Sequence, residues 1–173
     1  PELRAEFWHV PHDWTVSVES EVNLQYTAGG PEALLDTRRG PEEWRTGAWQ
    51  GYEGQDFSAV VDFGETLTVS GAWAGLLQDQ RSWILMPTEV TFEVGDLDHS
   101  YREVLRVTHE VGDQWSGVHI RDLGGEFEPV DGRYLRVRAR NYGPLPDWHL
   151  GAGGETFIFI DEILISARPV GDD

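Results

Sequence analysis

Aromatic and polar side chains gather in one turn-rich stretch of the chain, residues 141–154. It contains Tyr142, Asp147, Trp148 and His149 among glycines and prolines, and an apolar run at 156–165 follows at once. A loop held between two apolar strands mounts its side chains on a rigid base. Indole faces can stack on a ligand, and planar polar groups can hydrogen-bond to it. This stretch is the first candidate for a binding site.

Two more loops are unusually rich in aromatic or polar residues. The loop at 36–54 carries Trp44, Trp49 and Tyr52, which is more aromatic content than a passive connection needs. Trp49 and Tyr52 either extend a binding surface or form a loop core, and the core is favoured. The third loop, 78–87, contains Gln78, Asp79, Arg81 and Trp83.

The segments between these loops alternate between apolar and polar residues, as half-buried strands do. In the segment 133–140, Arg136, Arg138 and Arg140 share one face and the apolar residues share the other. A turn is expected around Gly64 and Glu65, and one helical turn at 31–35. The predicted strands are 15–19, 57–63, 67–73, 88–94, 101–107, 116–122, 133–140 and 156–165, with a short piece at 24–27. About eight short strands and almost no helix predict an all-β antiparallel sandwich.

Length and composition bound the classes of function. The 173 residues fit one domain, with a lead-in at 1–14, the sandwich at 15–168 and a tail at 169–173. A net charge of -18, from 31 acids and 13 arginines, disfavours nucleic acid and anionic membrane as partners. There is no cysteine, no signal-peptide pattern and no apolar run of about 20 residues. The chain reads as a domain excised from a longer protein, or as a processed chain.

Few residues suit catalysis or metal binding. Asp161 and Glu162 are neighbours in the last strand, so their side chains are expected on opposite faces, where they cannot act as an acid and base pair. One of them is expected to face inward and to need a cation or several donors. His9 and His12 have a metal-ligand spacing but no evident third ligand, and ordinary packing is favoured. His99, His109 and His119 lack clustered partners. A stand-alone hydrolase therefore has no support.

Several segments together resemble a known family. They are 25–30, 34–36 with 39–40, 49–56, 77–83 with 86–90, 133–137, and 147–149 through 151–154 to 161–163. Their order and spacing resemble the discoidin-like (coagulation factor five/eight type C) domains at the C-terminus of bacterial family 20 glycoside hydrolases, the beta-N-acetylhexosaminidases. The resemblance covers residues 15–166. It implies an eight-stranded jelly-roll sandwich of the galactose-binding-like fold, related to the family 32 carbohydrate-binding modules.

The resemblance also implies where a ligand and a metal would bind. In such modules the loops after the first, third and seventh core strands meet at one end, and these correspond to the three loops above. A structural Ca²⁺ lies between the first loop and a C-terminal glutamate, at positions matching Asp36 and Glu162. Thr37 stands where the family has glycine. The alternative is that Glu162 pairs with an arginine such as Arg45 or Arg138.

Two functions follow as expectations. The first is a non-catalytic module of a secreted bacterial glycoside hydrolase, extracellular or periplasmic, that binds a glycan of the N-acetylhexosamine or galactose type. Its candidate ligand-binding residues are Gln78, Asp79, Arg81, Trp83, Asp147, Trp148 and His149. The second is an accessory domain that packs on its own catalytic domain. In that case Arg81, Trp83 and Trp148 brace one another, with Asp147 as counter-ion.

Overall fold

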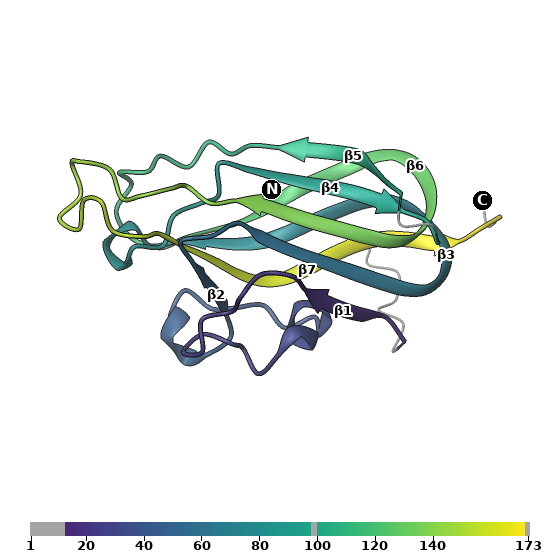
Figure 1. The fold of residues 1–173 in the computed structure, drawn as a ribbon, viewed down its shortest axis with the longest axis horizontal. Coiled ribbons are helices and arrows are strands. Elements are labelled where there is room, and N and C mark those ends of the chain that lie inside the picture. The colour runs from purple at the N-terminus through teal and green to yellow at the C-terminus, as the bar shows by residue number, and fades with distance from the viewer. Residues whose placement is uncertain (1–12, 98–99, 172–173) are drawn as a thin grey trace.

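The computed structural model describes residues 13–97 and 100–171, and they form an antiparallel β-sandwich (Figure 1). Its strands are β1 (Thr15–Val18), β2 (Gln50–Glu53), β3 (Phe57–Gln78), β4 (Glu89–Gly95), β5 (Tyr101–Val107), β6 (His119–Arg140) and β7 (Phe157–Pro169). The short helices are η1 (Pro31–Leu35), η2 (Trp44–Thr46) and η3 (Gln80–Ser82). The predicted fold class is confirmed. No described helix has the length and apolar character needed to span a membrane.

Two long strands, β3 and β6, pass from one layer of the sandwich into the other. The first half of β3 pairs with β1 and with the end of β6, and β4 and β5 complete that layer. The second half of β3 pairs with β7 and with the start of β6, and β2 lies outside β7. The two layers are therefore continuous along β3 and β6. The segments predicted at 116–122 and 133–140 are parts of the single strand β6, which begins at His119, and two predicted segments likewise merge in β3. With β2 added, the described residues form seven strands instead of the expected eight.

The turn predicted at Gly64 and Glu65 is wrong, because β3 continues through it. The register between β3 and β6 shifts between Asp62 and Leu67, and Gly64 has a positive φ of 79°. Bulges of this kind bend a strand and raise its twist. The segments predicted at 57–63 and 67–73 are thus parts of one bent strand.

Two other strand predictions need correction. The piece predicted at 24–27 is not a strand: Leu24 is exposed, and only an isolated bridge joins Thr27 to Gln50. The segment 50–53, placed in a loop from the sequence, is strand β2 because it pairs with β7. The helical turn predicted at 31–35 is confirmed as η1, and its Leu34 is fully buried.

The core between the layers follows the predicted alternation. In β6, Leu135, Val137 and Ala139 are buried, whereas the arginines between them lie on the outer face. A second, smaller apolar cluster lies outside β7 and joins Phe159 to the aromatic loop 36–54. Trp49 and Tyr52 are buried, so the interpretation of these rings as loop core is confirmed. This second cluster supports the end of the sandwich where the remaining aromatic loops meet.

Candidate functional site

A hollow of about 520 Å³ lies at one end of the sandwich, between the loops that follow β3 and β6. These loops extend from the end of the molecule opposite the C-terminus (Figure 1). Two tryptophans line the hollow and are partly exposed, Trp83 by 38% and Trp148 by 41%. The other lining residues are Gln80, Arg81, His149 and Leu150. Two exposed indoles beside a cation make this hollow the best candidate for a ligand site.

The loop after β3 presents Trp83 from a small closed turn. Backbone hydrogen bonds join Asp79 and Ile84 in both directions, so the turn is closed at its base. The Asp79 carboxylate accepts hydrogen bonds from the Ser82 hydroxyl (2.7 Å) and the Trp44 indole (3.2 Å). Trp83 itself has a positive φ of 68°, an uncommon conformation for a bulky residue. The turn therefore holds this ring at a defined position.

The loop after β6 presents Trp148 from a second closed turn. Leu145 and Gly154 are joined by a backbone hydrogen bond of 2.8 Å, and Leu145 also accepts one from Gly153. At the base of the loop, the Asn141 amide donates to the Thr156 carbonyl at 3.1 Å. Because its polar groups are satisfied internally, this loop is a rigid mount rather than a free chain.

His149 joins the two loops. Its Nδ1 accepts the Gly151 N–H at 2.9 Å, so the ring donates from Nε2 to the Gln80 carbonyl at 2.8 Å. The ring also contacts both tryptophans edge-on, with centroids 6.5 Å from Trp83 and 5.6 Å from Trp148. Both ring nitrogens are hydrogen-bonded and the side chain is buried. His149 therefore holds the two loops together, and its ring lines the hollow.

The structure separates the seven predicted ligand-binding residues into two groups. Arg81, Trp83, Trp148 and His149 line the hollow. Gln78 does not: it is 1% exposed, and its amide bonds the Gly112 carbonyl and the Met86 N–H. Asp79 closes its own turn, and Asp147 is exposed beside Trp148 without lining the hollow.

The bracing alternative is met only in part. Trp83 packs against glycines, since a Cβ at Gly151 or Gly154 would lie 2.6 to 2.7 Å from its ring. Arg81 is exposed, and it takes part in none of the cation–π contacts or ion pairs among residues 13–97 and 100–171. One face of Trp83 is therefore structural, while Arg81 remains available to a ligand.

Sequence reasoning missed two residues of the hollow, Gln80 and Leu150. Gln80 contributes its backbone carbonyl to His149, which no side-chain pattern could indicate. Leu150 is fully exposed, although it is a large apolar residue directly after Trp148 and His149. An apolar residue inside a glycine-rich polar loop was a usable signal for a residue that contacts a partner.

The neighbouring carboxylates of β7 point toward the same loop, contrary to the expectation that they point apart. Asp161 accepts hydrogen bonds from Arg39 (2.9 Å) and the Gly40 N–H (2.7 Å), and Glu162 accepts one from the Thr37 N–H. The reason is a bulge: the register shifts so that both residues lie opposite Gly75. Both side chains are 1% exposed, so neither can reach a substrate.

Asp161 is the carboxylate that pairs with an arginine. Arg39 lies between Asp161 and Asp122 and forms ion pairs with both. A Cβ at Gly75 would lie 1.9 Å from Asp161 Oδ1 and 2.6 Å from Arg39, so only glycine leaves room for this pair. Arg45 pairs with Glu43 instead, and Arg138 lies on the outer face of β6, so neither of the two arginines considered for Glu162 pairs with it.

Glu162 has the features of a cation ligand. Its Oε2 is buried without a hydrogen-bond partner. Burial, together with the nearby charges of Asp36 and Asp161, raises the pKa of Glu162 to about 8. Thr37 adopts a φ of 65°, in the left-handed region that favours glycine.

These residues fit a hard cation only with help from the backbone. Within the described part of the chain, no three His, Cys, Asp or Glu side chains are placed around one metal position. A cation beside Glu162 and Asp36 would take its other ligands from backbone carbonyls, which suits calcium. His9, His12 and His99 lie outside the described residues. His109 Nδ1 accepts the Val111 N–H, and His119 bonds the Ser116 carbonyl.

Comparison with known proteins shows which solved structures share this fold. No family model and no curated protein sequence matches the chain. Among solved structures, the family 32 carbohydrate-binding module of NanJ from Clostridium perfringens, in complex with galactose, has a TM-score of 0.55 and 14% identity. The match covers 90% of this chain and 93% of that one.

Two further solved structures are similar in the same way. The C-terminal domain of a chitobiase from Bacteroides fragilis has a TM-score of 0.54 and 14% identity, covering 92% of this chain and 97% of that one. A fucolectin from striped bass (Morone saxatilis) serum has a TM-score of 0.59 and 16% identity, covering 92% and 49%. The chain therefore has the discoidin-like, galactose-binding-like fold of family 32 modules, as its sequence predicted.

Proposed function

We propose that this protein is a non-catalytic carbohydrate-binding module that holds a glycan in the hollow between Trp83 and Trp148. The observation that carries the proposal is that two indoles, each about two-fifths exposed, line one hollow together with Arg81. Their turns are closed by internal hydrogen bonds, so the surface is formed before a ligand arrives. A preformed aromatic surface suits a sugar ring, because little conformational entropy of the protein is lost when the sugar binds.

Similar proteins support this choice of ligand. The module of NanJ binds galactose, and another module from Clostridium perfringens was solved with GalNAc-beta-1,3-galactose. We extend the proposal to a neutral hexose or N-acetylhexosamine ligand and to a parent enzyme outside the cell, in the extracellular or periplasmic space. The resemblance to domains of beta-N-acetylhexosaminidases supports such a parent, in which the module would raise the concentration of glycan near the catalytic domain.

One observation favours a second function, an accessory domain that packs on its own catalytic domain. Leu150 is fully exposed at the rim of the hollow, beside Trp148. An exposed apolar group next to an indole is also typical of a protein contact. In this alternative the hollow receives a side chain of the partner domain rather than a sugar.

Titration calorimetry separates the two functions. The protein is titrated with galactose, N-acetylgalactosamine, N-acetylglucosamine and chito-oligosaccharides. Heat that saturates with at least one of them is the expected result for a binding module. A protein that melts cooperatively yet gives no heat with any sugar would favour the accessory function.

We also propose that a structural Ca²⁺ binds beside Glu162 and Asp36. The buried, unpartnered Glu162 Oε2 supports this, because an isolated buried charge is costly without a cation. When bound, the cation would supply the positive charge that this carboxylate lacks. Its role would be to hold the loop 36–40 against β7, not to contact the glycan.

Without calcium, we expect the protein to lose stability as the pH rises from about 4.5 to about 8. The pKa of Glu162 is raised to about 8 by burial, so the folded protein retains a proton that the unfolded chain releases near its usual pKa of 4.5. The stabilisation is therefore complete below pH 4.5 and is lost through pH 8. The expected loss is on the order of a few kcal/mol.

Thermal melts with a chelator and with added calcium, at several pH values, measure this effect. Calcium should raise the melting temperature most at high pH. Glu162→Gln, which keeps the shape of the protonated side chain, should reduce the pH slope and abolish the calcium response. A wild-type melting temperature that calcium leaves unchanged at every pH would contradict the proposed metal site.

A further inference from the structure

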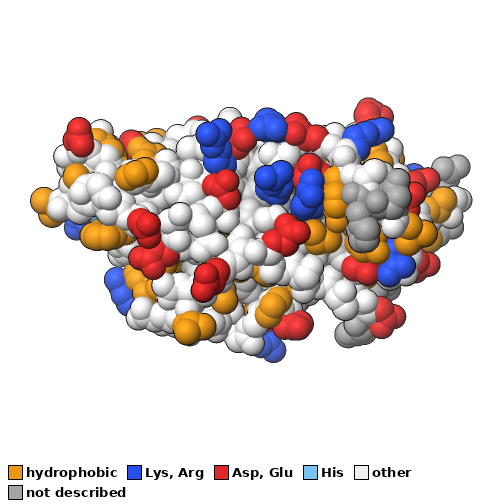
Figure 2. Space-filling view, viewed as in Figure 1, with side chains coloured by type: hydrophobic (Ala, Val, Ile, Leu, Met, Phe, Trp, Pro, Cys, Tyr) orange, Lys and Arg blue, Asp and Glu red, His pale blue; other side chains and the backbone are white. Residues whose placement is uncertain are grey.

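A second hollow, of about 540 Å³, lies on the outer face of the sheet, away from the tryptophan loops. Four of the thirteen arginines of the chain line it, from strands β5 and β6. Figure 2 shows basic side chains gathered over β4, β5 and β6 near the middle of one face, with acidic side chains around them. In a protein with a net charge of -18, this local excess of arginine needs an explanation. The arginines are Arg106, Arg136, Arg138 and Arg140.

Two of these arginines are neutralised by glutamates. Arg136 forms a bidentate pair with Glu93 (2.6 and 2.9 Å) and lies over the Tyr101 ring. Arg106 bonds Glu89 at 2.7 Å and also pairs with Glu103. These five charged groups form structural ion pairs along the sheet.

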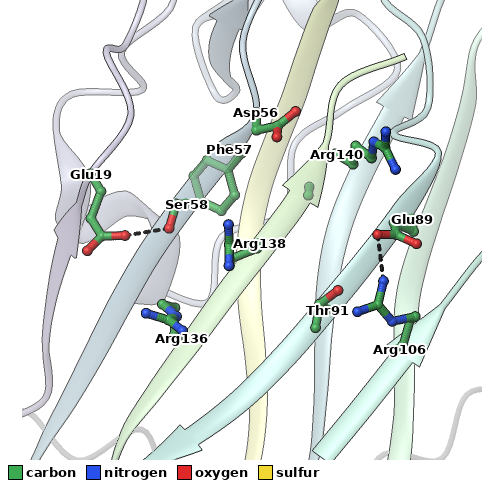
Figure 3. A pocket seen from close by; sticks show the side chains of 11 residues that line it. Glu19, Asp56, Phe57, Ser58, Glu89, Thr91, Arg106, Arg136, Arg138 and Arg140 are labelled. Atoms are coloured by element: carbon green, nitrogen blue, oxygen red, sulfur yellow. Dashed lines mark hydrogen bonds and ion pairs between the residues drawn. The ribbon is translucent and has the colours of Figure 1, made fainter. Parts of the chain in front are cut away.

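The other two, Arg138 and Arg140, are not neutralised. Neither forms an ion pair within residues 13–97 and 100–171. The cross-strand neighbour of Arg140 is Glu89, but the Glu89 carboxylate bonds Arg106. Arg138 lies between Ser58 and Thr91, which offer hydroxyl groups instead of charges (Figure 3). Arg138 and Arg140 are thus exposed guanidinium groups in a hollow of ligand size.

The acids that line the hollow are used elsewhere. Glu89 pairs with Arg106, whereas Glu19 accepts the Ser58 hydroxyl and Asp56 accepts the Asn141 N–H at 2.8 Å. Glu19 and Asp56 keep their negative charge, but neither forms an ion pair with Arg138 or Arg140 within the described residues. The lining contains no exposed aromatic ring, since Phe57 is fully buried. This hollow therefore lacks a stacking surface, and its unpaired cations are the guanidinium groups of Arg138 and Arg140. That chemistry differs from the chemistry of the tryptophan hollow.

We infer that this arginine groove binds an acidic saccharide, one whose ring carries a carboxylate. Arg138 receives the carboxylate as a planar fork, Arg140 adds a second positive charge, and Ser58 and Thr91 lie beside the ring hydroxyls. The strongly negative field of the rest of the protein repels long polyanions, so the ligand is a short oligosaccharide with few charges. The arginine groove is separate from the proposed glycan site between Trp83 and Trp148.

The test is calorimetric titration of the protein with a short oligogalacturonate at low salt. Arg138→Gln should weaken binding at least about tenfold, because a bidentate charge-assisted contact is lost. Arg168→Gln is the matched control: it makes the same change in net charge at an exposed arginine near the end of β7, outside the groove. Arg138→Lys, which keeps the charge without the fork, should give an intermediate affinity.

Three further comparisons define the ligand. The methyl-esterified oligogalacturonate, which lacks the charge, should not bind. Sulfate should compete with the oligogalacturonate no better than chloride does at equal ionic strength. The Trp148→Ala variant should bind the oligogalacturonate as the wild type does. The inference is overturned if the wild type does not bind, or if a melting-competent Arg138→Gln variant binds as well as the wild type. It is also overturned if sulfate displaces the saccharide, or if Trp148→Ala abolishes binding.

Discussion

Replacing Trp148 by alanine is expected to weaken binding of a neutral sugar at least tenfold while leaving the fold intact. The indole is 41% exposed at the hollow, so a bound sugar ring would cover it and its removal would lose that contact. Buried aromatic contacts at binding sites are commonly worth about 2 kcal/mol or more. Because the ring contributes little to the core, the melting temperature should change little.

A second exposed tryptophan serves as the control. Trp115 is 45% exposed but does not line the hollow, and its ring contacts His119 instead. Trp115→Ala should bind sugar as the wild type does in the same calorimetric or NMR titration. Equal binding by the wild type, Trp148→Ala and Trp83→Ala would remove the hollow as the sugar site, wherever the sugar then proved to bind.

The largest effect on stability is expected from Arg39→Gln. Asp161 is fully buried and would keep only the Gly40 N–H as a partner. Removing one partner of a buried ion pair typically costs about 3 to 5 kcal/mol, because the other charge stays buried. Because Arg39 is partly exposed, the expected loss of unfolding free energy lies at the lower end of that range, about 3 kcal/mol at pH 7.

The pH dependence identifies the cause. Burial already raises the pKa of Asp161, and losing Arg39 should raise it further. The variant is then most stable below the usual pKa of an aspartate and loses stability as the pH rises through the raised value. Urea unfolding should therefore show a smaller difference from the wild type at low pH than at pH 7.

Two variants make this prediction sharp. Arg45→Gln breaks the pair of Arg45 with Glu43, whose side chains are both mostly exposed, and should cost no more than about 1 kcal/mol. Adding Asp161→Asn to Arg39→Gln removes the buried charge and should recover part of the lost stability. A single-variant loss that is small and equal at both pH values would argue that Asp161 is not held by Arg39.

Local sequence pattern was enough to predict the fold class and the core. The alternation of residues 133–140 correctly assigned Leu135 and Val137 to the interior and the arginines to the outer face. This works because side chains on a strand alternate with a period of two, whatever the strand pairs with. The same local signal, aromatic residues in glycine-rich loops, correctly indicated the end of the sandwich that contains Trp83 and Trp148.

Tertiary structure decided the features that depend on a partner strand or a neighbouring loop. The bulge opposite Gly75 turns Asp161 and Glu162 toward one loop, which the alternation rule excludes. The backbone carbonyl of Gln80 bonds His149 and so joins the two loops that border the hollow. Which arginines of β6 remain unpaired depends on how the glutamates of β4 are shared between β5 and β6. Sequence by itself therefore determined which residues lie inside and which loops are rich in binding groups. Strand register and loop contacts, which join residues distant in sequence, determined which of those groups are free to bind.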